Sequence, residues 1–163
     1  MSPQSRNPQL KQLRVLVVDD APMMCDLMRH LLGAVGVEQV ETARNGDEAF
    51  GLMATWRPDV AFVDWEMSPI NGIDFVRAVR RSSRSPNPYL PIIMVSGHAE
   101  PERVVSARDA GVHEYLVKPI TPYGVLMRLG EVINRPREFL RTETYFGPAP
   151  RQAIKAAPAL APA

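Results

Sequence analysis

The sequence is poor in cysteine, in long apolar runs and in net charge, and each shortage excludes a class of protein. The 163 residues include one cysteine, Cys25, so neither an intrachain disulfide nor a cysteine zinc cluster can form. No apolar run approaches the roughly 20 residues that a membrane-spanning helix needs. Lysine and arginine number 19 against 18 acidic residues, and this net charge of +1 does not favour a nucleic-acid-binding protein.

The ends of the chain differ in composition from its middle. The polar start MSPQSRNPQLKQ lacks the apolar stretch of a secretory signal, so we expect a soluble, cytoplasmic protein. Several of the 16 prolines gather near the two termini, and the last residues are rich in alanine and proline. The sequence therefore predicts a flexible leader over 1–11, one folded domain over 12–135, and a C-terminal extension over 136–163 that is disordered from 147 onward.

Within the domain, short apolar runs alternate with helical patterns. Strands are expected at 13–18, 40–43, 60–64, 91–96 and 113–118, and a helix follows each of them. Asp20 is the expected N-cap of the first helix, whose apolar face excludes Met23 and Cys25. This alternation predicts an α/β fold, a doubly wound five-stranded parallel sheet. In such a sheet, ligands bind at the carboxyl ends of the strands.

Polar side chains stand at the expected ends of four strands. Asp19 and Asp20 follow the first, Asp64 ends the third, Ser96 ends the fourth and Lys118 ends the fifth. Singly, these residues are more often a helix cap, a turn residue or a solvated charge. Together, three carboxylates repel one another unless a cation offsets them, and oxygen ligands favour Mg²⁺.

Such a group of residues suits phosphoryl transfer onto a carboxylate. Asp64 is the expected nucleophile because it ends a central strand between the other groups. Asp20 is the expected direct metal ligand, and Asp19 would hold a metal-bound water. Lys118 and Ser96 would contact the anionic oxygens of the transferred group.

Four segments in this order, VLVVDDAPMM, VDWEMSPINGIDF, IIMVSGHAE and EYLVKPIT, resemble the receiver domain of two-component response regulators. The resemblance covers about residues 12–135 and is to the chemotaxis-regulator-like, single-domain type. It implies a flavodoxin-like receiver fold with strand order 2-1-3-4-5. It also implies a bacterial signalling phosphoprotein, rather than an enzyme, with self-catalysed phosphotransfer and slow autodephosphorylation.

The resemblance assigns a role to each residue of the site. Asp64 would be the phosphoacceptor and Lys118 would bind the phosphoryl group. Asp19, Asp20, Asp64 and the backbone carbonyl of Glu66 would surround Mg²⁺. The phosphoryl donor would be a histidine kinase or a histidine phosphotransfer protein.

A second set of residues would transmit the signal. Ser96 matches the family's switch hydroxyl, Tyr115 matches its rotating aromatic residue, and Pro119 would follow a cis peptide bond. The target would bind to the fourth helix, fifth strand and fifth helix of the domain. Glu66 and His98 would flank the path of the hydrolytic water and so tune the lifetime of the phosphorylated state.

The loop after the acceptor departs from the family pattern. It reads Met-Ser-Pro-Ile-Asn-Gly over 67–72, with the proline one place later than the family's, although Gly72 stays in register. This departure concerns the conformation of the loop and not the pocket.

Two other functions fit the same fold. A Mg²⁺-dependent phosphohydrolase with an aspartyl nucleophile usually has a second aspartate two residues further on, where this chain has Glu66. A nucleotide-binding module needs a glycine-rich loop after the first strand, where this chain has Asp19-Asp20-Ala21-Pro22. The sequence therefore favours a receiver domain over a phosphohydrolase or a nucleotide-binding module.

Some features outside the site allow two interpretations. Met23 is either part of a kinase-docking surface or an incidental exposed residue. The arginines of 77–84 favour a solvated helix end over a site for an anionic partner. The three histidines are too scattered for a metal site and favour surface or packing roles. The segment 137–146 either packs back on the domain or binds a partner.

Overall fold

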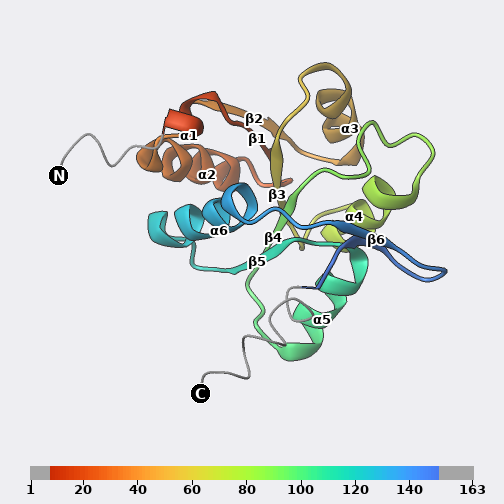
Figure 1. Ribbon diagram of the computed structural model, residues 1–163. Coiled ribbons are helices and arrows are strands. Elements are labelled where there is room, and N and C mark those ends of the chain that lie inside the picture. Colours follow the sequence, from red (N-terminus) through yellow and green to blue (C-terminus); the bar gives the residue numbers. More distant parts are fainter. Residues whose placement is uncertain (1–7, 151–163) are drawn as a thin grey trace.

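Short runs of β-branched and apolar residues form a parallel sheet in the computed structural model, which describes residues 8–150 (Figure 1). The strands are β1 (Arg14–Val18), β2 (Gln39–Ala43), β3 (Val60–Asp64), β4 (Ile92–Ser96) and β5 (Glu114–Val117). They pair in the order β2-β1-β3-β4-β5, all parallel. This arrangement confirms the predicted fold class and strand order.

Six helices accompany the sheet in the described part of the chain. They are α1 (Pro8–Gln12), α2 (Pro22–Val35), α3 (Gly46–Thr55), α4 (Gly72–Arg81), α5 (Pro101–Ala110) and α6 (Pro122–Asn134). Because α1 precedes the first strand, the helices expected after the five strands are α2 to α6. Every helix over 8–150 is too short or too polar to cross a bilayer.

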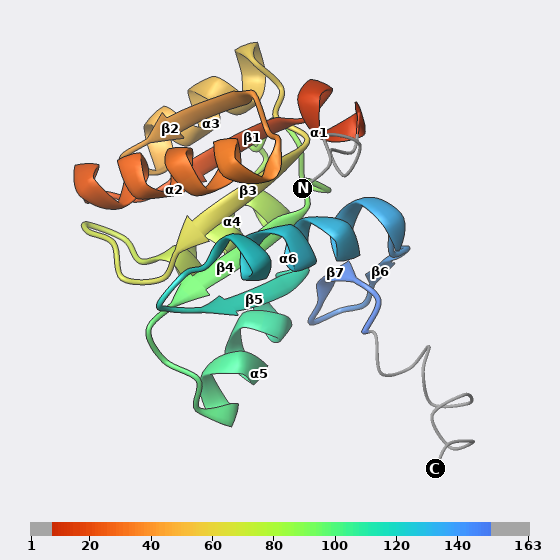
Figure 2. The same cartoon turned by 90° about the vertical axis from the view of Figure 1, so that its left-hand side faces the viewer.

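Two apolar layers hold the helices on the sheet. Val15 and Val17 of β1 face α2 and α6, whereas Leu16 and Val18 face α3, α4 and α5. Successive side chains of a strand point to opposite faces, so a continuous apolar strand fills both layers. Figure 2 shows α2 and α6 in front of the sheet, with α3 and α4 behind it.

The beginning of the first expected helix differs from the sequence prediction. Ala21, not Asp20, is the N-cap of α2, and no side chain caps this end of the helix. Cys25 is buried, because the inner face of α2 includes Cys25, Met28 and Leu32. Leu27 of the same helix is 41% exposed. The buried face is rotated because α2 packs against α6 as well as against the sheet.

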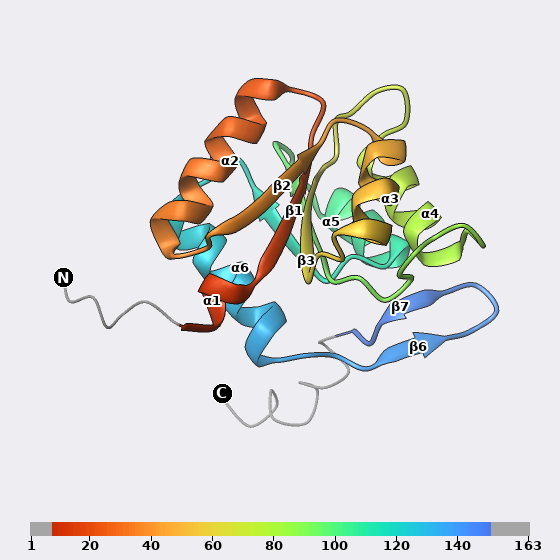
Figure 3. The same cartoon turned by 90° about the horizontal axis from the view of Figure 1, so that it is seen from above.

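The leader and the extension are partly folded. Residues 8–11 of the expected flexible leader form α1 together with Gln12, and Leu10 is buried against the α2 layer. In the extension, β6 (Phe139–Arg141) and β7 (Phe146–Pro148) form an antiparallel hairpin that includes part of the segment expected to be disordered. Figure 3 shows this hairpin at the edge of the domain where the strands begin. Residues 1–7 and 151–163 lie outside the described residues.

Arg77, Arg81 and Arg84 of the arginine stretch are exposed, as expected for a solvated helix end, but the hairpin helps to enclose Arg80. Arg80 is 3% exposed, and its guanidinium donates hydrogen bonds to the carbonyl oxygens of Gly111 and Pro88. The same guanidinium lies 5.1 Å from the centre of the Phe139 ring of the hairpin. Arg81 donates to the carbonyl oxygen of Thr144. The segment 137–148 therefore packs back on the domain.

Candidate functional site

The carboxyl ends of the parallel strands bring the predicted site residues to one edge of the sheet. Asp64 is the last residue of β3 and Ser96 the last of β4, while Asp19 and Lys118 directly follow β1 and β5. The register aligns Asp64 with Val95 and Ser96 with Val117. Asp19 N donates to the carbonyl oxygen of Ala43, and Lys118 N donates to that of Ser96, so the ladder continues past both strand ends.

Asp64 and Lys118 form the closest charge pair of the site. Lys118 Nζ lies 2.9 Å from Asp64 Oδ1, and Asp64 is 5% exposed. Burial raises the pKa of Asp64, and the contact with Lys118 offsets only part of this effect. For Lys118, burial lowers the pKa, but the neighbouring carboxylates outweigh burial and the net shift is upward. The ammonium is therefore held in its charged form beside the acceptor.

Asp19 and Asp20 complete an acidic pocket, and their surroundings differ. Asp19 is buried, and its Oδ1 accepts a hydrogen bond from Ala21 N at 2.9 Å. Asp20 is exposed, and its Oδ2 accepts from Ser68 N at 3.0 Å. Burial raises the pKa of Asp19 to about 6, and the charge on Asp64 acts in the same direction. A positive charge in this pocket would relieve the repulsion among the carboxylates.

The loop after Asp64 is folded tightly over the end of β3. Gly72 N donates to the carbonyl oxygen of Trp65 at 2.8 Å, and a Cβ on Gly72 would collide with the carbonyl oxygen of Asp64. Only glycine therefore fits here without a shift of the loop. The Ser68–Pro69 bond of this loop is cis. The Lys118–Pro119 bond is also cis, as the resemblance implied.

The family model for the response regulator receiver domain matches residues 15–129. The chain belongs to this family.

Relatives of this receiver domain include proteins named for chemotaxis. It is 37% identical over 123 residues to chemotaxis protein CheY1 of Helicobacter pylori strain ATCC 700392 / 26695, covering 75% of this chain and 98% of that protein. It is 31% identical over 123 residues to chemotaxis protein CheY of Pseudomonas aeruginosa PAO1, covering 76% of this chain and 98% of that protein. Proteins of this family are phosphoacceptor signalling proteins rather than classical enzymes.

A solved structure agrees with this assignment. Vibrio cholerae chemotaxis response regulator CheY4 superimposes with a TM-score of 0.66 at 34% sequence identity, over 74% of this chain and 98% of CheY4. This likeness agrees with the flavodoxin-like fold of the sheet.

The hydroxyls of Ser96 and Tyr115 both contact the backbone of His98 in this receiver domain. Ser96 is fully buried, and its Oγ accepts a hydrogen bond from His98 N at 3.1 Å. Tyr115 is only partly buried, and its hydroxyl donates to the carbonyl oxygen of His98 at 2.7 Å. Its ring lies edge-on to Trp65, with 6.4 Å between the ring centres.

Arg103 and Trp65, at the rim of the site, escaped the sequence predictions. Arg103 of α5 stacks over the Trp65 ring at 4.4 Å and forms an ion pair of 3.1 Å with Glu66 Oε2. His98 lies 4.0 Å from the same carboxylate oxygen. Because Trp65 directly follows the acceptor Asp64, its position in the sequence could have placed it at the site. The partner of Arg103 is 37 residues away and belongs to another element, so no local pattern indicates it.

The donor set fits a hard cation, although the carboxylates are not drawn together into a ready cluster. Over residues 8–150, no three His, Cys, Asp or Glu side chains are gathered in a geometry that would hold a metal. Mg²⁺ keeps several waters and usually binds one or two carboxylates directly, so it does not need such a cluster. Asp19, Asp20 and Asp64 supply only oxygen ligands, and Asp64 Oδ1 is buried with the ammonium off the direction of a good hydrogen bond.

Proposed function

We propose that this receiver domain accepts a phosphoryl group on Asp64 from a histidine kinase or a histidine phosphotransfer protein. The observation that carries the proposal is the buried Asp64 carboxylate, 2.9 Å from Lys118 Nζ and beside the acidic pair Asp19-Asp20. A lysine and a carboxylate pair are expected where an anionic phosphoryl group must approach a nucleophilic carboxylate.

The transfer follows from the charges of this site. A carboxylate oxygen of Asp64 attacks phosphorus, and a P–O bond forms as the P–N bond to the donor imidazole breaks. The electron pair of the broken bond stays on that imidazole nitrogen. Lys118 stabilises the negative charge on the phosphoryl oxygens. Because burial raises the pKa of Asp64, Lys118 also serves to keep the acceptor ionised.

Mg²⁺ is the proposed cofactor of this transfer. Asp20, Asp64 and the backbone carbonyl of Glu66 would bind it, and Asp19 would hold a metal-bound water. When bound, the ion would neutralise charge on the phosphoryl oxygens. Asp19 and Asp20 each use one carboxylate oxygen in a backbone hydrogen bond, which fixes the orientation of both side chains.

The phosphoryl group would then change a protein-binding surface formed by α5, β5 and α6. Ser96 would exchange its contact with His98 N for a hydrogen bond to the phosphoryl group. Tyr115 would leave the carbonyl oxygen of His98 and turn inward. The phosphorylated state is favoured only through contacts that the unphosphorylated state lacks, and the Ser96 hydrogen bond is that contact.

Replacement of Asp64 tests the acceptor. Label from a phosphohistidine donor, with Mg²⁺, should enter the wild-type protein and not Asp64→Asn, because the amide is not a nucleophile for phosphorus. Asp74→Asn, on the exposed side of α4, is the matched control and should take up label normally. Failure of the wild-type protein to accept label from any donor, acetyl phosphate included, would overturn the proposal.

Replacement of Ser96 tests the switch. Ser96→Ala should still accept label on Asp64, because the Ser96 hydroxyl would contact the phosphoryl group only after the rearrangement. The variant should lose the change that beryllofluoride causes in the NMR signals of the Tyr115 ring. An unchanged Tyr115 signal in the wild-type protein with beryllofluoride and Mg²⁺ would remove the basis of the switch.

A further inference from the structure

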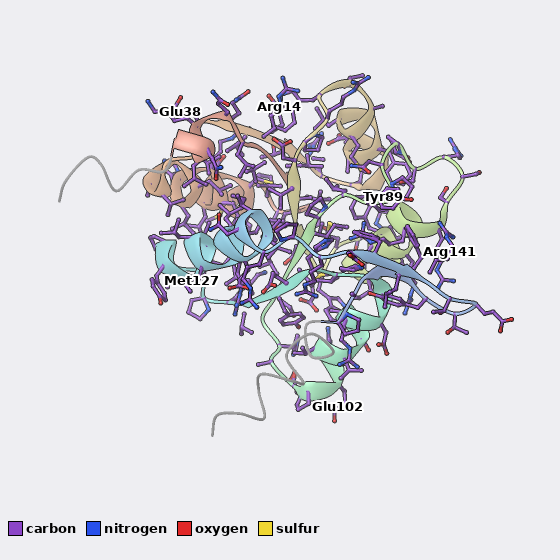
Figure 4. All side chains as sticks on the ribbon, viewed as in Figure 1. Arg14, Glu38, Tyr89, Glu102, Met127 and Arg141 are labelled. Carbon is purple, nitrogen blue, oxygen red and sulfur yellow. The ribbon has the colours of Figure 1, made fainter. Side chains whose placement is uncertain are left out.

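The described course of the extension ends inside a groove between α5 and β5. The groove has a volume of about 190 Å³ and is lined mainly by Val104, Ala107, Val112, Tyr115, Arg137 and Pro150. Because Pro150 is itself part of the lining, the chain passes into residues 151–163 from within the groove. Figure 4 labels Glu102 in the first turn of α5, and the hairpin lies at the opposite end of this helix.

Buried polar contacts fix the direction in which the chain leaves the hairpin. Arg137 Nη2 lies 2.9 Å from Glu114 Oε2, and both side chains are at most 10% exposed. The same nitrogen donates to the carbonyl oxygen of His113 at 2.6 Å. Ala149 N donates to the carbonyl oxygen of Glu138 at 2.7 Å. The extension is therefore anchored on β5, next to Tyr115, before it reaches Pro150.

We infer that residues 151–163 bind along the α5–β5 groove of their own chain. The ten residues of α5 span about 15 Å, and an extended chain covers about 3.3 Å per residue, so the segment is long enough for Ile154 to reach the far half of α5. There Val104 is 39% exposed and offers apolar surface to Ile154. Pro158 and Pro162 favour an extended backbone, which suits a groove rather than a helix–helix contact.

Residues 151–163 bound in this groove would compete with the target for the proposed target surface. Tyr115 forms one wall of the groove, so a bound segment covers part of the surface that the switch would change. An inward turn of Tyr115 would then remove a wall of the groove and release the segment. This consequence rests on the proposed function, whereas the binding of 151–163 in the groove does not.

A spin label on the extension tests the place of binding in the full chain. The label is attached to Ala157→Cys, and Cys25 stays unlabelled because it is buried and burial raises the pKa of its thiol. The amide signals of residues 104–108 and 114–116 should lose most of their intensity. Those of α2 and α3 should keep theirs. Equal broadening of the signals of all these segments, or broadening of the signals of α2 or α3 alone, overturns the inference.

Matched variants separate the groove from the rest of α5. Val104→Glu places a charge in the groove and should restore the lost intensity, whereas Val105→Glu, on a neighbour that is 40% exposed and outside the lining, should not. In residues 151–163, Ile154→Asp should also restore the intensity. Leu160→Asp is the control for Ile154→Asp. Equal effects of Val104→Glu and Val105→Glu would contradict a specific groove.

Two further measurements identify the occupant and its coupling to the switch. In one of them, spin-labelled chains without ¹⁵N are mixed with ¹⁵N chains that carry no spin label. The signals of the ¹⁵N chains should show no broadening, and broadening in this mixture would assign the groove to a segment of a second copy instead. Beryllofluoride with Mg²⁺ should restore the intensity. Broadening that persists with beryllofluoride would overturn the coupling to the switch and would leave the place of binding supported by the first measurement.

Discussion

Asp19 and Asp64 are buried carboxylates at the ends of the neighbouring strands β1 and β3, and their proximity is costly without a cation. The pKa of each is raised, chiefly by burial. For Asp19 the folded-state pKa of about 6 exceeds its ordinary value of 3.8. Between these values the folded protein binds more protons than the unfolded chain, so stability falls as the pH rises through this range.

Asp19→Asn should therefore stabilise the metal-free protein in alkaline solution. The gain at about pH 8 should be roughly 1–3 kcal/mol, since one pKa unit corresponds to about 1.4 kcal/mol. It should shrink towards pH 4, where Asp19 is protonated in the folded state. Urea unfolding with a chelator present measures both values. Asp26→Asn, on the exposed face of α2, is the control, and an equal gain at both pH values would contradict the explanation.

At the scale of elements, most of the fold could be predicted because its signals are local. The apolar strands at 60–64 and 91–96 lie within one residue of β3 and β4, and Asn45 and Thr121 cap α3 and α6 through their side chains. Asp20 does not cap α2, because its carboxylate accepts from Ser68 N, 48 residues along the chain. A local cap rule cannot include a partner at that separation.

The grouping of the site residues could be predicted from the topology of the sheet, but the residues at the rim of the site could not. Parallel strand ends must meet at one edge, so Asp64 and Lys118 were expected to be neighbours, and they are. Arg103 reaches Trp65 and Glu66 only through the packing of α5 beside the loop after β3. Likewise, the sequence predicts that Arg80 is a surface arginine, because its contacts with the hairpin and with the carbonyl oxygen of Gly111 are not local.

Arg80 of α4 joins the C-terminal end of α5, the loop before β4 and the hairpin, so its loss should destabilise the contacts among them. Burial lowers the pKa of its guanidinium to about 9, a cost that the three hydrogen bonds to Gly111 and Pro88 offset. Arg80→Leu leaves buried carbonyls unpaired and should cost roughly 2–4 kcal/mol in urea unfolding. Arg77→Leu, on the same helix with an exposed ion pair to Asp74, should cost less than about 1 kcal/mol. Similar losses for both variants would count against a linking role for Arg80.

At the scale of the whole molecule, the two edges of the sheet carry different structures. The acidic pocket lies where the strands end, and α1 and the hairpin lie where they begin (Figure 3). The described part of the extension therefore leaves the proposed phosphoryl site open. Its last residue, Pro150, lines the groove beside Tyr115, so the extension meets the proposed target surface and not the acceptor.

The two tryptophans lie at these opposite edges and allow binding of Mg²⁺ to be followed in the intact protein. Trp65 directly follows Asp64, whereas Trp56 follows α3 and lies 6.0 Å from the guanidinium of Arg14, the first residue of β1. Mg²⁺ should change the fluorescence of the wild-type protein and of Trp56→Phe, but not that of Trp65→Phe. Since Asp19 would hold a metal-bound water in its ionised form, the affinity for Mg²⁺ should fall as the pH falls through about 6, the pKa of Asp19. A response that survives Trp65→Phe, or an affinity that is constant across this range, would place the cation away from the acidic pocket.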